Sequence, residues 1–550
     1  MVVKGSVHQA STRKTRPKSF QHEPSLDPYI AKQLERFELF QTNQCYYLIG
    51  CNRTNTHYRV LTFDRTLIER PAVVETNNKS NAAITSPIQR SHSNNSNLSS
   101  SDIANNHSAE NSSNFYQQQQ HQANMAAAEQ SHNAKPTLRP LCDFLREDDH
   151  VYTQEEIKEL LDVVHDGNRL DEQISNSNNN NHGSSSSSNP STSGVGGLKP
   201  IVRAYGIVGF IRFLDCYYLT LITRRAKVGS IGGNGIYTIK GTESFPLKPR
   251  GALSSVDTDQ QADPSSVLLS MWNRGKRQIG LGLSGREIAE LRYQGLFQVI
   301  NLNSNFFFSY TYDLTRSLQE NFLATSAKPF PPPPFKDMYA WNYFLTQELE
   351  ECLNSLTSYH WVMPIIHGAF VQRKLNDYGR SLNLILIARR SRHFAGTRYL
   401  KRGVNEQGKV ANDVEHEQIL HDESKSASAG IFSSYLQVRG SIPTFWTQES
   451  SMTMPKPPIE LNRVDPTYTA TQLHFQDLFT RYGSPICVWD LVKQSEKRER
   501  EVRVGNEFRH GIDYINTSID DEHKIRSGYE WLLHSTKYKY AHLTMSSYCC

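Results

Sequence analysis

The residues best suited to chemistry form a basic stretch at 389–403. It reads RRSRHFAGTRYLKRG and contains six Arg or Lys residues and no acidic residue. The apolar run SLNLILIA directly before it predicts a buried strand. Guanidinium groups match phosphate oxygens with paired hydrogen bonds, so a basic loop at a strand end suits a ligand with several phosphates. The alternative is a solvated basic surface that binds no ligand.

Three arginines are the candidate phosphate-binding residues: Arg398 and Arg402 in this stretch, and Arg439 on the next predicted strand. An unpaired cation beside apolar strands is costly, so each of them requires a partner. That partner is either a ligand phosphate or an internal ion network with Glu415 and Glu417. The sequence leaves both interpretations open.

Two other motif matches do not fit their structural context. GLGLSG at residues 280–285 follows no strand, which excludes a dinucleotide site. A short helix is expected at residues 411–420, and on a helix His416 and His421 would point about 140° apart. A zinc site needs both histidines on one face, so the sequence predicts no metal and no other cofactor.

Composition narrows the class of protein and its compartment. The chain has 550 residues, with 60 basic and 55 acidic side chains and a net charge of +5, which argues against a nucleic-acid partner. The apolar runs are too short to span a bilayer, and the N-terminus lacks the apolar core of a signal peptide. Eight scattered cysteines indicate a reducing compartment rather than a disulfide framework. We therefore expect a cytoplasmic protein, peripheral to a membrane.

The order of predicted elements gives an α+β fold in two parts. A disordered N-terminus at 1–36 precedes a β-rich part at 37–330 and a second part of strands and helices at 331–550. Thr153 and Glu156 form a capping box at the start of a helix. Segments poor in periodic apolar residues are predicted to be disordered insertions. These insertions are 77–135, 175–197 and 250–275.

Two long motifs in this order resemble the SAC domain signature of phosphoinositide phosphatases. The first is LIARRSRHFAGTRYLKRGVNEQGKVANDVEHEQIL and the second is SSYLQVRGSIPTFWTQ. The segment TMPKPPIELNRVDPTYTATQLHFQDLFTRYGSPICVWDLVK and the acidic Asp413 resemble the endolysosomal branch of that family. The resemblance extends over most of residues 37–540, the insertions excepted. It implies a β-rich SAC N-terminal subdomain and an incomplete α/β catalytic subdomain.

The resemblance also implies a reaction. The family uses a Cys-x5-Arg loop, in which a thiolate attacks phosphorus without a metal ion. No cysteine of this chain has an arginine six positions later, so we identify no catalytic residue and expect a C-terminally truncated, inactive form. The implied substrate is phosphatidylinositol 3,5-bisphosphate, dephosphorylated at the 5-position. The implied partners are a phosphoinositide kinase and a helical-repeat scaffold on endosomal and lysosomal membranes. The alternative is a non-catalytic module that binds partners or lipid headgroups.

Overall fold

The computed structural model describes most of the chain. The described residues are 2–4, 33–68, 139–179, 198–250, 285–327, 333–353, 357–377, 379–397, 399–422, 431–448, 457–497 and 499–527. The predicted insertion 77–135 and the candidate residue Arg398 lie outside them. The segments 175–197 and 250–275 also lie outside, except for residues 175–179 and 250.

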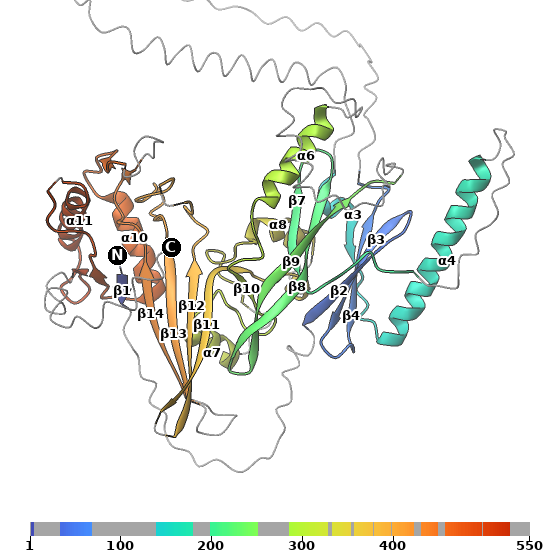
Figure 1. The fold of residues 1–550 in the computed structure, drawn as a ribbon, viewed down its shortest axis with the longest axis horizontal. Coiled ribbons are helices and arrows are strands. Elements are labelled where there is room, and N and C mark those ends of the chain that lie inside the picture. Colours follow the sequence, from blue (N-terminus) through green and yellow to red (C-terminus); the bar gives the residue numbers. More distant parts are fainter. Residues whose placement is uncertain are drawn as a thin grey trace, which may run out of the picture.

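The first part of the chain forms a small antiparallel sheet with the strand order β5-β4-β3-β2-β6. Alternate residues of these strands, such as Leu39, Leu48 and Phe63, are buried on one face. Two helices, α3 and α4, lie next to this sheet (Figure 1). The bounds are β2 Leu34–Gln41, β3 Cys45–Asn52, β4 Tyr58–Asp64, α3 Leu141–Phe144, β5 Leu145–Glu147, α4 Gln154–Asn179 and β6 Val202–Ala204.

The predicted capping box at the start of α4 is confirmed. The Thr153 backbone N–H donates to Glu156 Oε2 at 2.8 Å, and the Glu156 N–H donates to Thr153 Oγ1 at 3.3 Å. These two bonds satisfy backbone donors that the helix itself cannot use. The helix continues to Asn179, so residues 175–179, which we expected to be disordered, are helical. Extending a nucleated helix costs little, and polar residues do not stop it.

Other strands of the chain form a larger sheet, which contains eleven strands within the described residues. Their order is β18-β17-β1-β14-β13-β12-β11-β10-β9-β8-β7. The predicted domain boundary at 330 falls between β10 and β11, which pair directly in this sheet. The bounds are β1 Val2–Lys4, β7 Ile207–Arg212, β8 Tyr217–Ile231, β9 Asn234–Leu247, β10 Phe306–Phe308, β11 Ile366–Asp377, β12 Arg380–Arg390, β13 Val414–Asp422, β14 Ile431–Arg439, β17 Cys487–Trp489 and β18 Arg526–Ser527.

Helices cover this sheet at both ends. Near β14 and β17, apolar side chains of α10 and α11 pack onto Val438 and Val488, while α8 packs on β7 at the other end (Figure 1). A short pair of strands, β15 and β16, lies before α10 in the chain. The bounds are α6 Gly285–Gln298, α7 Leu318–Ala327, α8 Tyr343–Cys352, α9 Ser358–Trp361, β15 Trp446–Thr447, β16 Glu460–Leu461, α10 Thr469–Tyr482 and α11 Glu501–Asn516.

Three expectations from the sequence are corrected here. The segment 411–420, predicted as a helix, lies mostly in strand β13, which is held by pairing with β12 on one side and β14 on the other. Within 1–36, β1 pairs with β14 and β17, and β2 begins at Leu34. Cys142 and Cys352, expected to be free thiols, form a disulfide.

The predicted α+β class is confirmed, because helices and antiparallel sheets occur together throughout the described residues. In that part of the chain, no helix is long and apolar enough to cross a membrane.

Candidate functional site

The basic stretch begins at the end of strand β12. Because successive side chains of a strand point to opposite faces of the sheet, Arg389 and Arg390 lie on different faces. Arg389 is in phase with Ile385 and Ile387, all three of which are fully buried on the inner face. Arg390 is in phase with Leu386, on the outer face, where Leu386 is 40% exposed. Two adjacent arginines therefore have opposite environments.

On the inner face, Arg389 holds two buried carboxylates. Its Nη1 donates to Glu415 Oε1 at 2.9 Å, and its Nη2 donates to Glu417. Two further donations reach the backbone carbonyls of Leu314 at 2.5 Å and Arg316 at 2.8 Å. Burial alone would lower the pKa of Arg389, but Glu417 and Glu415 outweigh it and raise the pKa above its ordinary value. This triad joins β12 and β13 to the segment before α7.

The carboxylates of the triad have further donors. Glu415 accepts from the hydroxyls of Tyr339 and Tyr482, at 3.3 Å for Tyr339. Glu417 accepts from the Leu318 backbone N–H at 2.7 Å and from Ser434 Oγ at 2.8 Å. Each carboxylate is thus paired with the guanidinium and also hydrogen-bonded, which is what a buried ion pair requires.

A second ion network lies on the same side, between α10 and the loop before β13. Arg481 Nε donates to Asp477 Oδ2 at 3.0 Å, and Arg481 Nη1 donates to the hydroxyls of Tyr339 and Tyr482. Lys409 Nζ donates to Asp477 Oδ1 at 3.1 Å. Asp413 is buried, with 5% of its surface exposed, and interacts electrostatically with Arg481, Asp477 and Lys409. Burial raises the pKa of Asp413 to about 6, although Arg481 acts in the opposite direction.

The outer face presents two cations at one end of the sheet. Arg390 on β12 and Arg439 on β14 both pair with Val414 on β13, which lies between them. Their backbones are therefore two strand spacings, or about 10 Å, apart. Arg390 donates to Gly396 O at 2.8 Å and Asn412 Oδ1 at 3.1 Å. Burial and the charge of Arg439 lower the pKa of Arg390. Among the described residues, no carboxylate lies within ion-pair distance of either arginine.

His416 lies on the same outer face and completes this cluster. Arg439 Nε donates to His416 Nε2 at 2.9 Å. Burial, with the charge of Arg439, lowers the pKa of His416 to about 4, so the imidazole is neutral at pH 7 and can accept this bond. We call Arg390, His416 and Arg439 the outer-face cluster. It carries the two positive charges of Arg390 and Arg439, and Arg439 is exposed.

Arg392 and Arg402, also in the basic stretch, contact protein groups. Arg392 donates to Asp337 at 2.6 Å and lies over the rings of Tyr343 and Phe344. Arg402 lies over the rings of Tyr399 and Trp446, with its guanidinium carbon 5.6 and 5.3 Å from the ring centroids. These contacts hold the stretch against the body of the protein.

The predicted site residues are therefore placed differently from one another. Arg439 lies in the outer-face cluster, Arg402 stacks on aromatic rings, and Arg398 is outside the described residues. The internal network weighed as an alternative exists, but Arg389 rather than these three arginines pairs with Glu415 and Glu417. Arg389 and Arg390 were not chosen from the sequence, although strict alternation along β12 could have separated them.

His416 and His421, rejected above as zinc ligands on helical geometry, lie five residues apart on a strand and thus on opposite faces. His421 stacks on Phe432, with ring centroids 4.1 Å apart.

Comparisons with known proteins agree on one family. The SacI homology domain model matches residues 205–545. The chain is 37% identical over 383 residues to phosphatidylinositol-3-phosphatase SAC1 of Arabidopsis thaliana, covering 70% of this chain and 36% of the relative. It is 42% identical over 338 residues to phosphoinositide phosphatase SAC5 of Arabidopsis thaliana, covering 60% of this chain and 38% of the relative.

A fungal protein gives a similar result. The chain is 37% identical over 339 residues to the polyphosphoinositide phosphatase of Schizosaccharomyces pombe, covering 60% of this chain and 36% of the relative. The chain thus spans less than two fifths of the length of these three relatives. Because the family model matches more than half of the chain, the protein belongs to the SacI homology domain family.

Proposed function

We propose that this chain recognises the headgroup of a polyphosphoinositide, and that it belongs to a phosphatase acting on phosphatidylinositol 3,5-bisphosphate at the 5-position. The observation that carries the proposal is the outer-face cluster. Two arginines stand there without a carboxylate among the described residues, at the end of the strands that bear the family signature.

The geometry of the cluster suits a ligand with two phosphates. Each guanidinium can donate a pair of hydrogen bonds to phosphate oxygens, and the two lie on strands separated by β13. Neutral His416 accepts a hydrogen bond from Arg439, and it carries no charge of its own that would compete with the ligand for Arg439. Arg398 and Arg402 remain proposed members of the same binding surface, from the loop that follows β12.

Hydrolysis requires more than this cluster. Phosphoryl transfer through a covalent intermediate needs a nucleophile held against the phosphate, and residues 1–550 contain no Cys-x5-Arg run. Binding the ground state alone does not lower the barrier. The proposed activity of residues 1–550 is therefore binding without turnover.

The setting of this function is proposed from the family resemblance. It consists of endosomal and lysosomal membranes, with a phosphoinositide kinase and a helical-repeat scaffold as partners. The three relatives are called a phosphatidylinositol-3-phosphatase, a phosphoinositide phosphatase and a polyphosphoinositide phosphatase, which supports a lipid phosphate as the ligand.

The test is co-sedimentation of residues 1–550 with phosphatidylcholine vesicles that contain either phosphatidylinositol or its 3,5-bisphosphate. We expect preferential binding to the bisphosphate vesicles, and at least a tenfold loss in Arg390→Gln/Arg439→Gln, since each charged hydrogen bond contributes about 1.5–3 kcal/mol. Arg203→Gln is the matched control, because Arg203 is an exposed strand arginine paired with Glu38. Equal binding by the double variant and the control would refute the assignment of the cluster.

The alternative is a non-catalytic module that binds another protein, and one observation favours it. Below the outer-face cluster, the same face of β11–β14 exposes a continuous set of aliphatic side chains. Their exposed fractions are Val371 40%, Leu375 42%, Leu386 40%, Leu420 36% and Ile431 50%. Exposed apolar surface of this kind is typical of a contact with another polypeptide. Loss of lipid binding in the cluster variant would favour the first function, and its retention would favour this one.

A further inference from the structure

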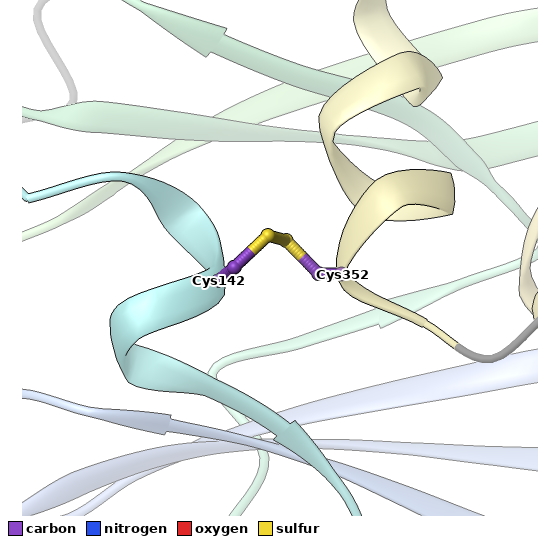
Figure 2. The surroundings of a disulfide bond; sticks show 2 residues. All are labelled: Cys142 and Cys352. Atoms are coloured by element: carbon purple, nitrogen blue, oxygen red, sulfur yellow. A yellow bond between two sulfur atoms is a disulfide. The ribbon is translucent and has the colours of Figure 1, made fainter.

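The disulfide between Cys142 and Cys352 joins two helices that are far apart in the sequence. Cys142 lies in α3 and Cys352 is the last residue of α8; their sequence separation is 210 and their Cα–Cα distance is 4.8 Å (Figure 2). Cys142 is exposed and Cys352 is partly buried. Small thiols can therefore approach the disulfide from the side of Cys142.

The two helices already pack together through apolar side chains. Leu141 and Phe144 of α3 share a core cluster with Leu349 of α8 and with Leu353, which follows it. Cys352 packs against the same cluster. This contact does not need the sulfur–sulfur bond, so the helices stay adjacent when the thiols are reduced. The bond adds a covalent restraint on the end of α8.

The other end of α8 touches the basic stretch. Trp341 Nε1 donates to the carbonyl of Arg390 at 2.8 Å, two residues before the helix begins. Tyr343 and Phe344, in the first turn, stack under Arg392 at 4.4 and 4.7 Å. The helix between these contacts and the disulfide is ten residues long, or about 14 Å at 1.5 Å per residue. One rigid element therefore connects the disulfide to the loop that carries the candidate phosphate-binding residues.

The first turn of α8 packs closely against the body of the protein. Asn342, just before the helix, donates to the carbonyls of Val208 at 3.2 Å and Met363 at 2.9 Å. The backbone of Leu345 lies so close to Gly209 that a Cβ there would be 2.4 Å from the Leu345 carbonyl oxygen. A restraint at Cys352 is thus transmitted through a well-packed helix rather than lost in a loose one.

We propose that Cys142 and Cys352 form a thiol–disulfide switch that sets the mobility of α8 and of the basic stretch. The oxidant is a low-molecular-weight disulfide of the glutathione type. The thiolate of exposed Cys142 attacks one sulfur of that disulfide, which breaks its bond, forms a mixed disulfide and releases one glutathione thiolate. The Cys352 thiolate then attacks Cys142 Sγ, which forms the protein disulfide and releases the second thiolate. The protein loses two electrons, and the two protons pass to the glutathione thiols.

The experiment equilibrates the full chain in buffers with graded ratios of oxidised to reduced glutathione. Differential alkylation and mass spectrometry measure the bonded fraction of Cys142 and Cys352, and hydrogen exchange measures protection of α8 and of residues 390–397. We expect a reversible transition from thiols to disulfide, with slower exchange in both segments when the bond is formed. Cys142→Ser/Cys352→Ser should show the fast exchange of the reduced protein at every ratio. Cys45→Ser/Cys51→Ser, which removes two partly buried free cysteines, should behave like the unchanged protein.

Two results would overturn the switch. One is that Cys142 and Cys352 stay alkylatable at every ratio, or stay bonded at every ratio including fully reducing conditions. The other is that the bond forms and breaks while exchange in residues 390–397 stays the same. The comparison of oxidised and reduced unchanged protein needs no substitution, so it decides the question even if the serine variant does not fold. Neither readout depends on lipid binding or on phosphatase activity.

Discussion

Replacing Arg389 by methionine tests the buried triad most severely. The guanidinium is fully buried and neutralises Glu415 and Glu417, which are 1% and 0% exposed. Its loss leaves both carboxylates without a counter-charge, although each keeps the two hydrogen bonds described above. Removing one partner of a buried ion pair costs about 3–5 kcal/mol of unfolding free energy. We expect Arg389→Met to lose an amount in this range.

Urea unfolding followed by tryptophan fluorescence measures this loss. With a slope of about 3 kcal/mol per molar urea, the midpoint should fall by roughly 1–1.7 M. The control is Arg203→Gln, which breaks the exposed pair with Glu38 and should cost less than about 1 kcal/mol. A midpoint shift of Arg389→Met no larger than that of the control would refute the argument.

The loss in Arg389→Met should come from the uncompensated charges of Glu415 and Glu417 rather than from lost packing. Neutralising both acids, as in Arg389→Met/Glu415→Gln/Glu417→Gln, should therefore recover part of the loss in urea unfolding. A triple variant no more stable than Arg389→Met would contradict this explanation.

Three further outcomes follow from the structure. Gly209→Ala should destabilise the protein by more than about 1 kcal/mol in thermal unfolding, because φ is +147° and the new Cβ would meet the Leu345 backbone. The folded-state pKa of Asp413, about 6, lies above its unfolded value, so its ionisation removes stability as pH rises through 6. Asp413→Asn should flatten that part of the curve of melting temperature against pH, and an unchanged slope would contradict the assignment. Limited proteolysis should cut first within 77–135 and 180–197, whose composition predicts disorder, and protection of either segment would count against it.

The strands were the part of the fold most accessible from the sequence. The apolar run before Arg389 predicted β12, because a short continuous apolar run is typical of a strand. The segment around His416 was misassigned, since its inward-facing positions include the acidic Glu415 and Glu417 and therefore show no apolar alternation. Pairing with β12 and β14 decides the matter, and such long-range pairing leaves no local signal.

The candidate site was predicted only in part, for the same reason. A basic loop after a strand was evident, and Arg439 was correctly placed on the strand that follows it. Its proximity to Arg390 depends on the register of three strands, which spacing does not give. The bond between Cys142 and Cys352 depends on the packing of α3 on α8 across 210 residues, so no cysteine spacing could show it.

The most direct test of the proposed function is phosphate release from phosphatidylinositol 3,5-bisphosphate in vesicles by purified residues 1–550. The polyphosphoinositide phosphatase of Schizosaccharomyces pombe serves as the reference in the same vesicles. Residues 1–550 contain no Cys-x5-Arg run, so we expect them to bind these vesicles and to release no phosphate above background. Release at a rate comparable to the reference would contradict this account and would place a nucleophile among residues to which we assign only binding.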